Sequence, residues 1–172
     1  MAIPETIDRT LLQTYLGDHL TGATGGRNRI RDMAKRYAGS DLGPDLARVA
    51  EEISDEHDHL ADLVDRLGLG QPLPKKALAA LAELAGRLKA NGRILTGSPM
   101  TPLLEIELMR SAVNGKQGLW ETLVVYAKEL GLDAAFYRRL AKQASQQSRT
   151  LEALHAVVRK DGLRPGKDPR AS

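Results

Sequence analysis

The sequence contains no cysteine among its 172 residues, which excludes disulfide bonds and thiolate metal ligands. It also lacks any run close to the roughly 20 consecutive apolar residues that a transmembrane helix needs. The first ten residues carry Glu5 and Asp8 and no apolar run, so no secretory signal is visible. Phosphate-binding loops and dinucleotide-binding fingerprints are absent as well. From these absences we expect a cytoplasmic protein without a membrane span.

A charge excess of one sign is equally absent. The chain has 25 basic and 22 acidic residues and a formal net charge of +3, too small to indicate nucleic-acid binding by itself. Arg27, Arg31 and Lys35 form a row on one face of a predicted helix, and Arg29 and Arg36 lie nearby. No aromatic residues interleave this row for stacking on bases. We interpret it as a solvated outer face and expect no nucleic-acid partner.

Two helices are predicted in the first half of the chain. Apolar residues recur at steps of three and four over about residues 6–37 and again over about residues 44–67, the period of amphipathic helices. Pro44 in the first turn and Gly68 after the last turn are typical of helix ends. The apolar seam of the second helix passes through Glu56. An acid on such a seam requires a partner, because a buried charge without one costs several kcal/mol.

The first helix is unusually rich in glycine, with Gly17, Gly22, Gly25 and Gly26. Each of these costs about 0.5–1 kcal/mol of helix stability relative to alanine. Two explanations are open: another helix approaches closely at the glycines, or the helix breaks near Gly25 and Gly26.

The second half of the chain repeats the plan of the first, with helices predicted over about residues 102–130 and 133–160. Between the two halves, residues 69–101 form a long crossover with one short helix over about residues 75–89. Two short loops with one long connection between them are typical of a four-helix bundle with a crossover. The fold predicted is therefore all-α.

A chain of 172 residues is long enough to bury the core of one domain. We place this domain at residues 1–161. Residues 162–172 are rich in proline, glycine and basic residues and are predicted to form a disordered basic tail.

Two short motifs sharpen this prediction: Tyr-Leu-Gly-Asp-His-Leu at residues 15–20 and Gly-Lys-Gln-Gly-Leu-Trp at residues 115–120. Over residues 6–161 the chain resembles the ferritin-like superfamily, and within it a bacterial branch without an assigned activity and with a degenerate di-metal ligand set. The resemblance implies a ferritin-like four-helix bundle. It also implies iron or manganese as the cofactor of any complete site.

A ferritin-like di-metal centre takes one carboxylate from each of two helices and a Glu-x-x-His pair from each of the other two. Glu56 and His59 have this spacing, whereas the middle of the last helix has no acid or histidine. The candidate ligands are Asp18, His19, Glu52, Glu56, His59, Glu105, Glu107, Glu152 and His155. Glu152 and His155 have the required spacing, but they lie at the edge of a seam that leucines occupy. The candidate ligands in the sequence therefore do not make up the complete ligand set of a di-metal centre.

A metal-free arrangement is the alternative. Lys116 is spaced three residues from both Val113 and Leu119 in the middle of the third helix. It can therefore form a buried ion pair with Glu56, to which His19 and Gln147 would add hydrogen bonds. A lysine in this place removes the need for a metal ion. We favour this polar core layer, with no cofactor, over a partial metal site and over a working di-iron oxidase.

The function predicted from the sequence is that of a non-catalytic ferritin-like bundle, which acts by self-association as a homo-oligomer (a dimer) or by binding a protein partner. The alternative is a metal-binding oxidoreductase or iron-storage protein that uses the partial carboxylate and histidine set with iron or manganese.

Overall fold

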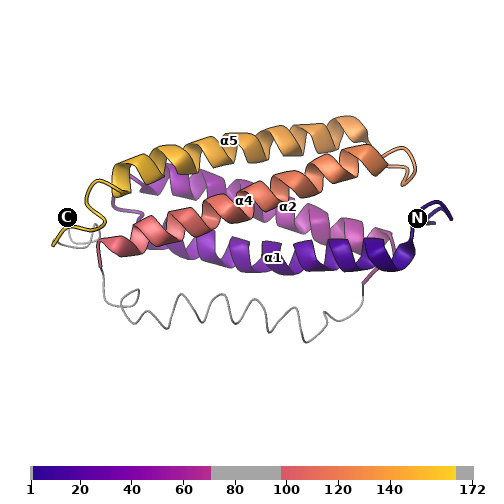
Figure 1. Cartoon of the computed structure of the whole chain (residues 1–172), viewed down its shortest axis with the longest axis horizontal. Coiled ribbons are helices and arrows are strands. Elements are labelled where there is room, and N and C mark those ends of the chain that lie inside the picture. The colour runs from indigo at the N-terminus through magenta and orange to yellow at the C-terminus, as the bar shows by residue number, and fades with distance from the viewer. Residues whose placement is uncertain (1, 71–97, 166–172) are drawn as a thin grey trace.

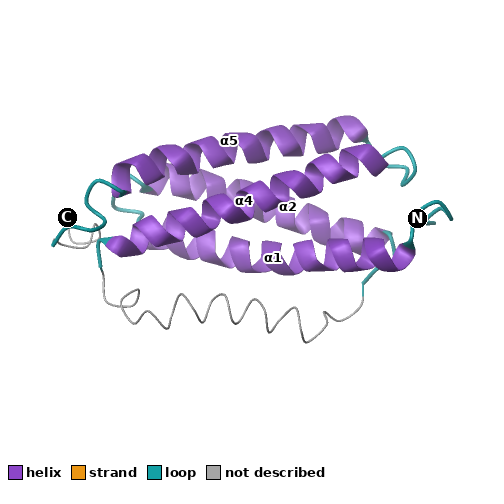
Figure 2. Ribbon diagram, in the orientation of Figure 1, coloured by secondary structure: helices purple, strands orange, loops and turns teal. Residues whose placement is uncertain are grey.

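Four α-helices make up the computed structural model, which describes residues 2–70 and 98–165 (Figures 1 and 2). They are α1 (Arg9–Arg36), α2 (Gly43–Arg66), α4 (Met100–Tyr126) and α5 (Ala134–Val158). The described residues contain no strand. The prediction of an all-α four-helix bundle is therefore confirmed. The short helix predicted over residues 75–89 and the last seven residues of the predicted tail lie outside the described residues.

Each half of the chain forms one antiparallel pair of helices. Helices α1 and α2 are antiparallel, as are α4 and α5, whereas α2 and α4 run the same way (Figure 1). Helix α1 packs on α2 and α4, and α5 packs on α4 and, less extensively, on α2. The end of α2 and the start of α4 consequently lie at opposite ends of the bundle (Figure 1). This topology is compatible with a ferritin-like fold.

Local chemistry fixes the ends of the helices close to the predicted bounds. The Asp8 carboxylate accepts hydrogen bonds from the backbone N–H groups of Thr10 and Leu11 and caps α1, and Asp133 caps α5 in the same way. Gly68 and Gly131 adopt positive φ angles of 64° and 62°, a conformation that favours glycine where a helix ends. Helix α4 ends at Tyr126, four residues before the predicted end at residue 130, and the residues that follow form turns.

The seams predicted from the period of apolar residues form the core. Leu16, Ile30 and Met33 of α1 are fully buried, and each of the other helices contributes its own apolar row. Trp120, Tyr37 and Tyr137 are the largest side chains of the core. Within the described ranges, the buried polar or charged residues are Thr21, Glu56, Thr101, Glu105 and Gln147. These exceptions locate the candidate site.

The glycines of α1 do not break the helix, which is continuous from Arg9 to Arg36. The expectation of a local break near Gly25 and Gly26 is therefore wrong. A Cβ atom built at Gly17, Gly22, Gly25 or Gly26 meets no atom of the described residues within 4 Å. These glycines thus leave space beside α1 that is free of described atoms.

We expect Gly25→Ala to raise the free energy of unfolding by about 0.5–1 kcal/mol, because alanine restricts the unfolded chain and its Cβ meets no described atom within 4 Å in the folded one. Gly43→Ala provides the contrast. Its Cβ would lie 2.7 Å from the backbone oxygen of Ala38 and 2.9 Å from that of Tyr37. We therefore expect a loss of about 1–3 kcal/mol, as for other overpacked sites. Urea unfolding followed by circular dichroism measures both changes, and a destabilised Gly25→Ala variant would contradict the account of α1.

Candidate functional site

A buried ion pair lies in the middle of the bundle. The Lys116 ammonium group of α4 donates hydrogen bonds to Glu56 Oε2 of α2 and, at 2.6 Å, to Gln147 Oε1 of α5. Gln147 Nε2 in turn donates to Glu56 Oε1 at 3.1 Å and to Glu52 Oε2 at 2.9 Å. These four side chains, which we call the polar layer, join three helices through one hydrogen-bonded network.

Three of the four residues of the polar layer are almost completely withdrawn from water, whereas the Glu52 side chain is 25% exposed. The Glu56 side chain is 2% exposed and that of Lys116 is 13% exposed, while Gln147 is fully buried. Each of the three residues lies on the inner seam of its helix, among leucine, valine and alanine side chains. Both carboxylate oxygens of Glu56 accept a hydrogen bond, so the buried charge is both neutralised and hydrogen-bonded.

Burial and pairing act on the two charges in opposite directions. Burial raises the pKa of Glu56 above its usual value, and the Lys116 ammonium opposes this rise. Burial lowers the pKa of Lys116, and the Glu56 carboxylate opposes that fall. Because desolvation is the largest cause for both groups, neither charge is stable here without the other.

His19, also predicted for this layer, lies beside it without joining its hydrogen bonds. It lines the same pocket as Glu56 and Lys116 but forms no hydrogen bond with the described residues. Its ring packs edge-on against Tyr15, with ring centroids 4.6 Å apart. Burial lowers the pKa of His19, so the ring is neutral at pH 7. Asp18, the adjacent candidate, is exposed at the rim of the pocket.

His59 does not share a site with Glu56, although their spacing suggested a Glu-x-x-His ligand pair. Its Nε2 atom lies 3.1 Å from the Tyr137 hydroxyl, and its ring packs against Phe136 and Trp120 at centroid distances of 4.6 and 6.3 Å. His59 therefore belongs to an aromatic cluster between α2, α4 and α5.

Glu105, another candidate ligand, forms a second buried ion network. It is 3% exposed. Its Oε1 atom accepts from Arg36 at 2.7 Å and from Arg29 at 3.2 Å, and its Oε2 atom accepts from the Tyr37 hydroxyl at 3.1 Å. Burial and this carboxylate raise the pKa of Tyr37 far above its usual range. Two arginines assigned to a solvated face thus reach inward across the α1–α4 contact.

The remaining candidate ligands lie on the outer parts of α4 and α5. Glu107 Oε1 lies 3.0 Å from His155 Nε2, and Glu152 pairs with Arg110 at 3.9 Å. Over residues 2–70 and 98–165, no three histidine, aspartate or glutamate side chains are placed so that they could hold one metal ion. The nine candidates are thus distributed over several separate contacts.

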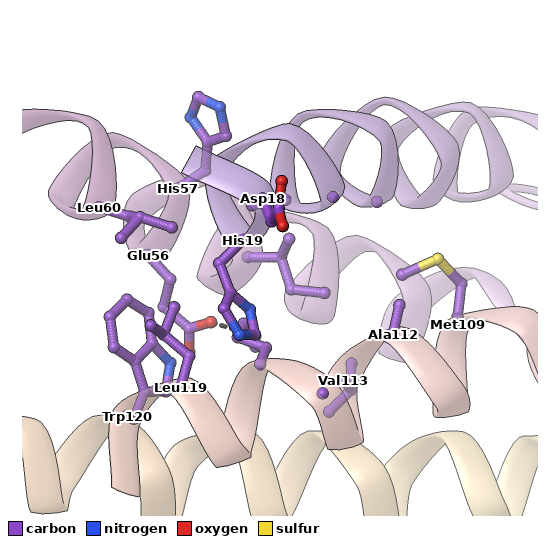
Figure 3. Close-up of a pocket in the computed structure, with 16 residues that line it drawn as sticks. Asp18, His19, Glu56, His57, Leu60, Met109, Ala112, Val113, Leu119 and Trp120 are labelled. Atoms are coloured by element: carbon purple, nitrogen blue, oxygen red, sulfur yellow. Dashed lines mark hydrogen bonds and ion pairs between the residues drawn. The ribbon is translucent and has the colours of Figure 1, made fainter. Parts of the chain in front are cut away.

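His57 projects away from Glu56 (Figure 3), as expected for the residue that follows an inward-facing one. It contacts Thr24, Arg27 and Asp58, and Arg27 forms an ion pair with Asp58 at 3.0 Å. Part of the basic row on α1 is therefore neutralised by α2.

A pocket of about 150 Å³ opens beside the polar layer, between α1, α2 and α4 (Figure 3). Glu56 and Lys116 line it together with His19 and Trp120. Three of its lining residues are glycines: Gly22, Gly26 and Gly115. The space left by the glycines of α1 is thus part of this pocket, which the sequence did not reveal.

Comparison with models of protein families, with curated proteins and with solved structures finds no match to this chain. No helix in the described part of the chain is both long and apolar enough to cross a membrane.

We expect Lys116→Met to lower the free energy of unfolding by about 3–5 kcal/mol, because it leaves the Glu56 carboxylate buried without its cation. The double variant Lys116→Met/Glu56→Met is expected to recover most of this loss, since both charges are then gone. Chemical unfolding of the wild type and the two variants measures the loss and its recovery.

Lys142→Met, the same substitution at an exposed position of α5, is the matched control, with an expected change within about 0.5 kcal/mol. Equal stabilities of Lys116→Met and Lys142→Met would show that the ion pair is not required.

Glu105 and Glu107 give a second matched comparison on one helix. Glu105→Gln removes the charge that faces Arg29 and Arg36 and is expected to cost about 1–3 kcal/mol. Glu107 is exposed, so Glu107→Gln is expected to change the free energy of unfolding by less than about 0.5 kcal/mol. Thermal or urea unfolding at neutral pH distinguishes the two, and equal losses would refute the buried network.

Proposed function

We propose that this protein is a non-catalytic bundle of the ferritin-like kind that works without a metal ion and acts by binding, to a second copy of itself or to another protein. The observation that carries the proposal is the contact of Lys116 with Glu56 and Gln147 at mid-bundle. Di-metal bundles hold their cations with side chains on facing helices of the core, and here the positive charge beside Glu56 is that of Lys116.

The chemistry of this contact favours an amine over a metal ion. A protonated lysine has no lone pair to donate to a metal, and its positive charge repels a second cation at short range in a poorly solvated interior. An amide, Gln147, and not a carboxylate faces Glu56 from α5, whereas a ferritin-like site takes a Glu-x-x-His pair from each of two helices. Glu56 is then satisfied by the side chains already present.

The topology supports the ferritin-like part of the proposal. Two antiparallel pairs, α1 with α2 and α4 with α5, follow each other along the chain, and α2 and α4 run in the same direction (Figure 1). This order of helices is shared by ferritin-like bundles.

Binding is supported by exposed apolar side chains at one end of the bundle. Leu11 is 69% exposed, Val125 74% and Tyr126 43%. Leu11 and Tyr126 line a hollow of about 320 Å³ between the start of α1 and the end of α4. Large apolar side chains gathered on a surface mark contact sites for other proteins. Self-association through this end is the simplest form of the proposal.

The proposal is tested by metal analysis of protein purified without chelators and then titrated with Fe²⁺ or Mn²⁺. We expect far less than one equivalent of metal and no rise in the midpoint of thermal unfolding, because a ligand stabilises a folded protein only if it binds to it. Sedimentation of the same samples is expected to show a dimer that Leu11→Glu dissociates.

The opposite outcome is equally specific. Near-stoichiometric iron or manganese that is lost in Glu56→Gln and retained in Glu107→Gln would establish the alternative function, an oxidoreductase or iron-storage protein with a partial site.

A further inference from the structure

The amine of the polar layer belongs to a side chain that also forms part of a pocket wall. Lys116 and Glu56 both line the pocket between α1, α2 and α4, and Glu56 and His19 project into this space (Figure 3). The Lys116 side chain is 13% exposed, whereas that of Glu56 is 2% exposed. A molecule in the pocket therefore contacts Lys116, whose amine is hydrogen-bonded to a carboxyl group.

A lysine in such surroundings differs chemically from one in water. Surface lysines are protonated and strongly hydrated, and a protonated amine has no lone pair with which to attack a carbonyl carbon. A lysine that is desolvated in an apolar pocket is the kind of amine that forms Schiff bases with carbonyl compounds. It also needs a group that takes up its proton. At Lys116 this group is Glu56, which the ammonium contacts directly.

The Lys116–Glu56 pair can lose both charges at once. Burial lowers the pKa of Lys116 and raises the pKa of Glu56, and it is the largest cause of the shift in each case. Transfer of one proton along their hydrogen bond gives a neutral amine and a neutral carboxylic acid, the forms that burial favours. This transfer leaves no charge without its partner. The pocket wall therefore contains a nucleophile with a proton donor next to it.

The size and the charge of the pocket determine which carbonyl compound fits. Its volume is about 150 Å³, and Ile53, Leu60 and Met109 are among its apolar lining residues. An apolar cavity of about this volume binds benzene in another protein. A carbonyl compound with a carboxylate of its own would meet Glu56 and Asp18, which also line the pocket. An uncharged aldehyde with a short apolar chain avoids this repulsion.

We propose that the pocket captures a small uncharged aldehyde as a reversible imine on the Lys116 amine, with Glu56 as the proton donor. The inference rests on the metal-free polar layer of the proposed function. It adds a second kind of binding to that function, in which the ligand is a small molecule and the bond is covalent.

The reaction balances within the polar layer. The amine nitrogen forms a bond to the aldehyde carbon, and the carbonyl oxygen becomes a hydroxyl group by taking a proton from that nitrogen. Glu56 then donates its proton to this hydroxyl group, the carbon–oxygen bond breaks and water leaves. The product is a protonated imine beside a carboxylate, so the layer has the charges with which it began.

The hydrogen bonds of the layer are largely retained in the product. The single N–H of the protonated imine can donate to Glu56, as the ammonium does now. Gln147 loses the hydrogen bond that it accepts from the amine, but the two that it donates to Glu52 and Glu56 do not involve Lys116. The carboxylate of Glu56 therefore stays neutralised and hydrogen-bonded after capture.

Reductive trapping tests the proposal on the full chain. The protein is incubated at neutral pH with butanal and sodium cyanoborohydride, which reduces an imine to a stable secondary amine, and its peptides are quantified by mass spectrometry. We expect Lys116 to gain a butyl group about tenfold or more faster than Lys142, an exposed lysine of α5. Labelling of Lys116 is expected to saturate with butanal concentration, because the aldehyde first occupies the pocket. Butan-1-ol, which has the same chain and no carbonyl group, is expected to slow the labelling of Lys116 and not that of Lys142.

Glycine variants test the location. Gly22 of α1 and Gly115 of α4 are exposed and line the pocket, and a Cβ atom at either position meets no described atom within 4 Å. Gly22→Leu places a side chain at the pocket and is expected to slow the labelling of Lys116 about tenfold. Gly25→Leu lies outside the pocket lining and is expected to be labelled as the wild type is. If Gly22→Leu fails to fold, Gly115→Leu narrows the same pocket from α4.

Lys116→Arg separates the chemistry from the structural role of the cation. Arginine keeps a positive charge beside Glu56, but its guanidinium group stays protonated and does not form the imine. We expect this variant to fold and to lose the saturable part of the labelling, as measured by the mass of the intact protein.

Three results would overturn the proposal: labelling of Lys116 no faster than that of Lys142, labelling of Lys116 that does not saturate, or equal labelling of Lys116 in the two glycine variants. Metal content measured on the same sample separates this failure from that of the proposed function. A metal-free protein without trapping refutes the aldehyde site alone, whereas stoichiometric iron or manganese refutes the amine-neutralised layer itself.

Discussion

A carboxylate inside a helical bundle requires a positive charge within reach, and in this protein the charge is an amine. Lys116 of α4 neutralises Glu56 of α2 across the core of the bundle, and Gln147 of α5 fills the remaining acceptor and donor positions. The cost of desolvating each ion makes the pair a weak source of net stability, yet removing one partner is expensive. The polar layer thus limits which side chains of α2, α4 and α5 can face one another in the core.

A second buried acid meets the same requirement by different means. Glu105 lies in the second turn of α4, and Arg29, Arg36 and Tyr37 reach it from α1 and the residue that follows α1. Guanidinium groups suit this place because their charge stays partly hydrated while the donors point inward. The two networks together hold α4 to α1 near its start and to α2 and α5 near its middle. The pocket lies beside the second of these attachments.

The period of apolar residues predicted the four helices, because a helix that buries one face has apolar residues at every third or fourth position. The same logic predicted the contact of Glu56 with Lys116 and Gln147, since all three occupy seam positions at similar depth. It did not place Glu105, whose partners depend on long arginine side chains that cross between helices. Nor did it place His59, whose three-residue spacing from Glu56 is compatible with a ligand pair but whose ring packs with Phe136. The signal that the sequence offered for the Glu105 network was the set Arg29, Arg36 and Tyr37. The two arginines are seven residues apart, and the tyrosine follows the second directly.

The amide of Gln147 has a consequence for how this architecture changes over evolutionary time. Gln147 contacts both Glu52 and Glu56, so Gln147→Glu together with loss of the amine at Lys116 would gather three carboxylates in one layer. Two codon changes therefore separate an amine-neutralised interior from one rich in ligands for hard cations. Either change alone leaves an excess of negative charge that burial tolerates only in protonated form. A sequence that changed from one form to the other one substitution at a time would therefore pass through an unfavourable intermediate.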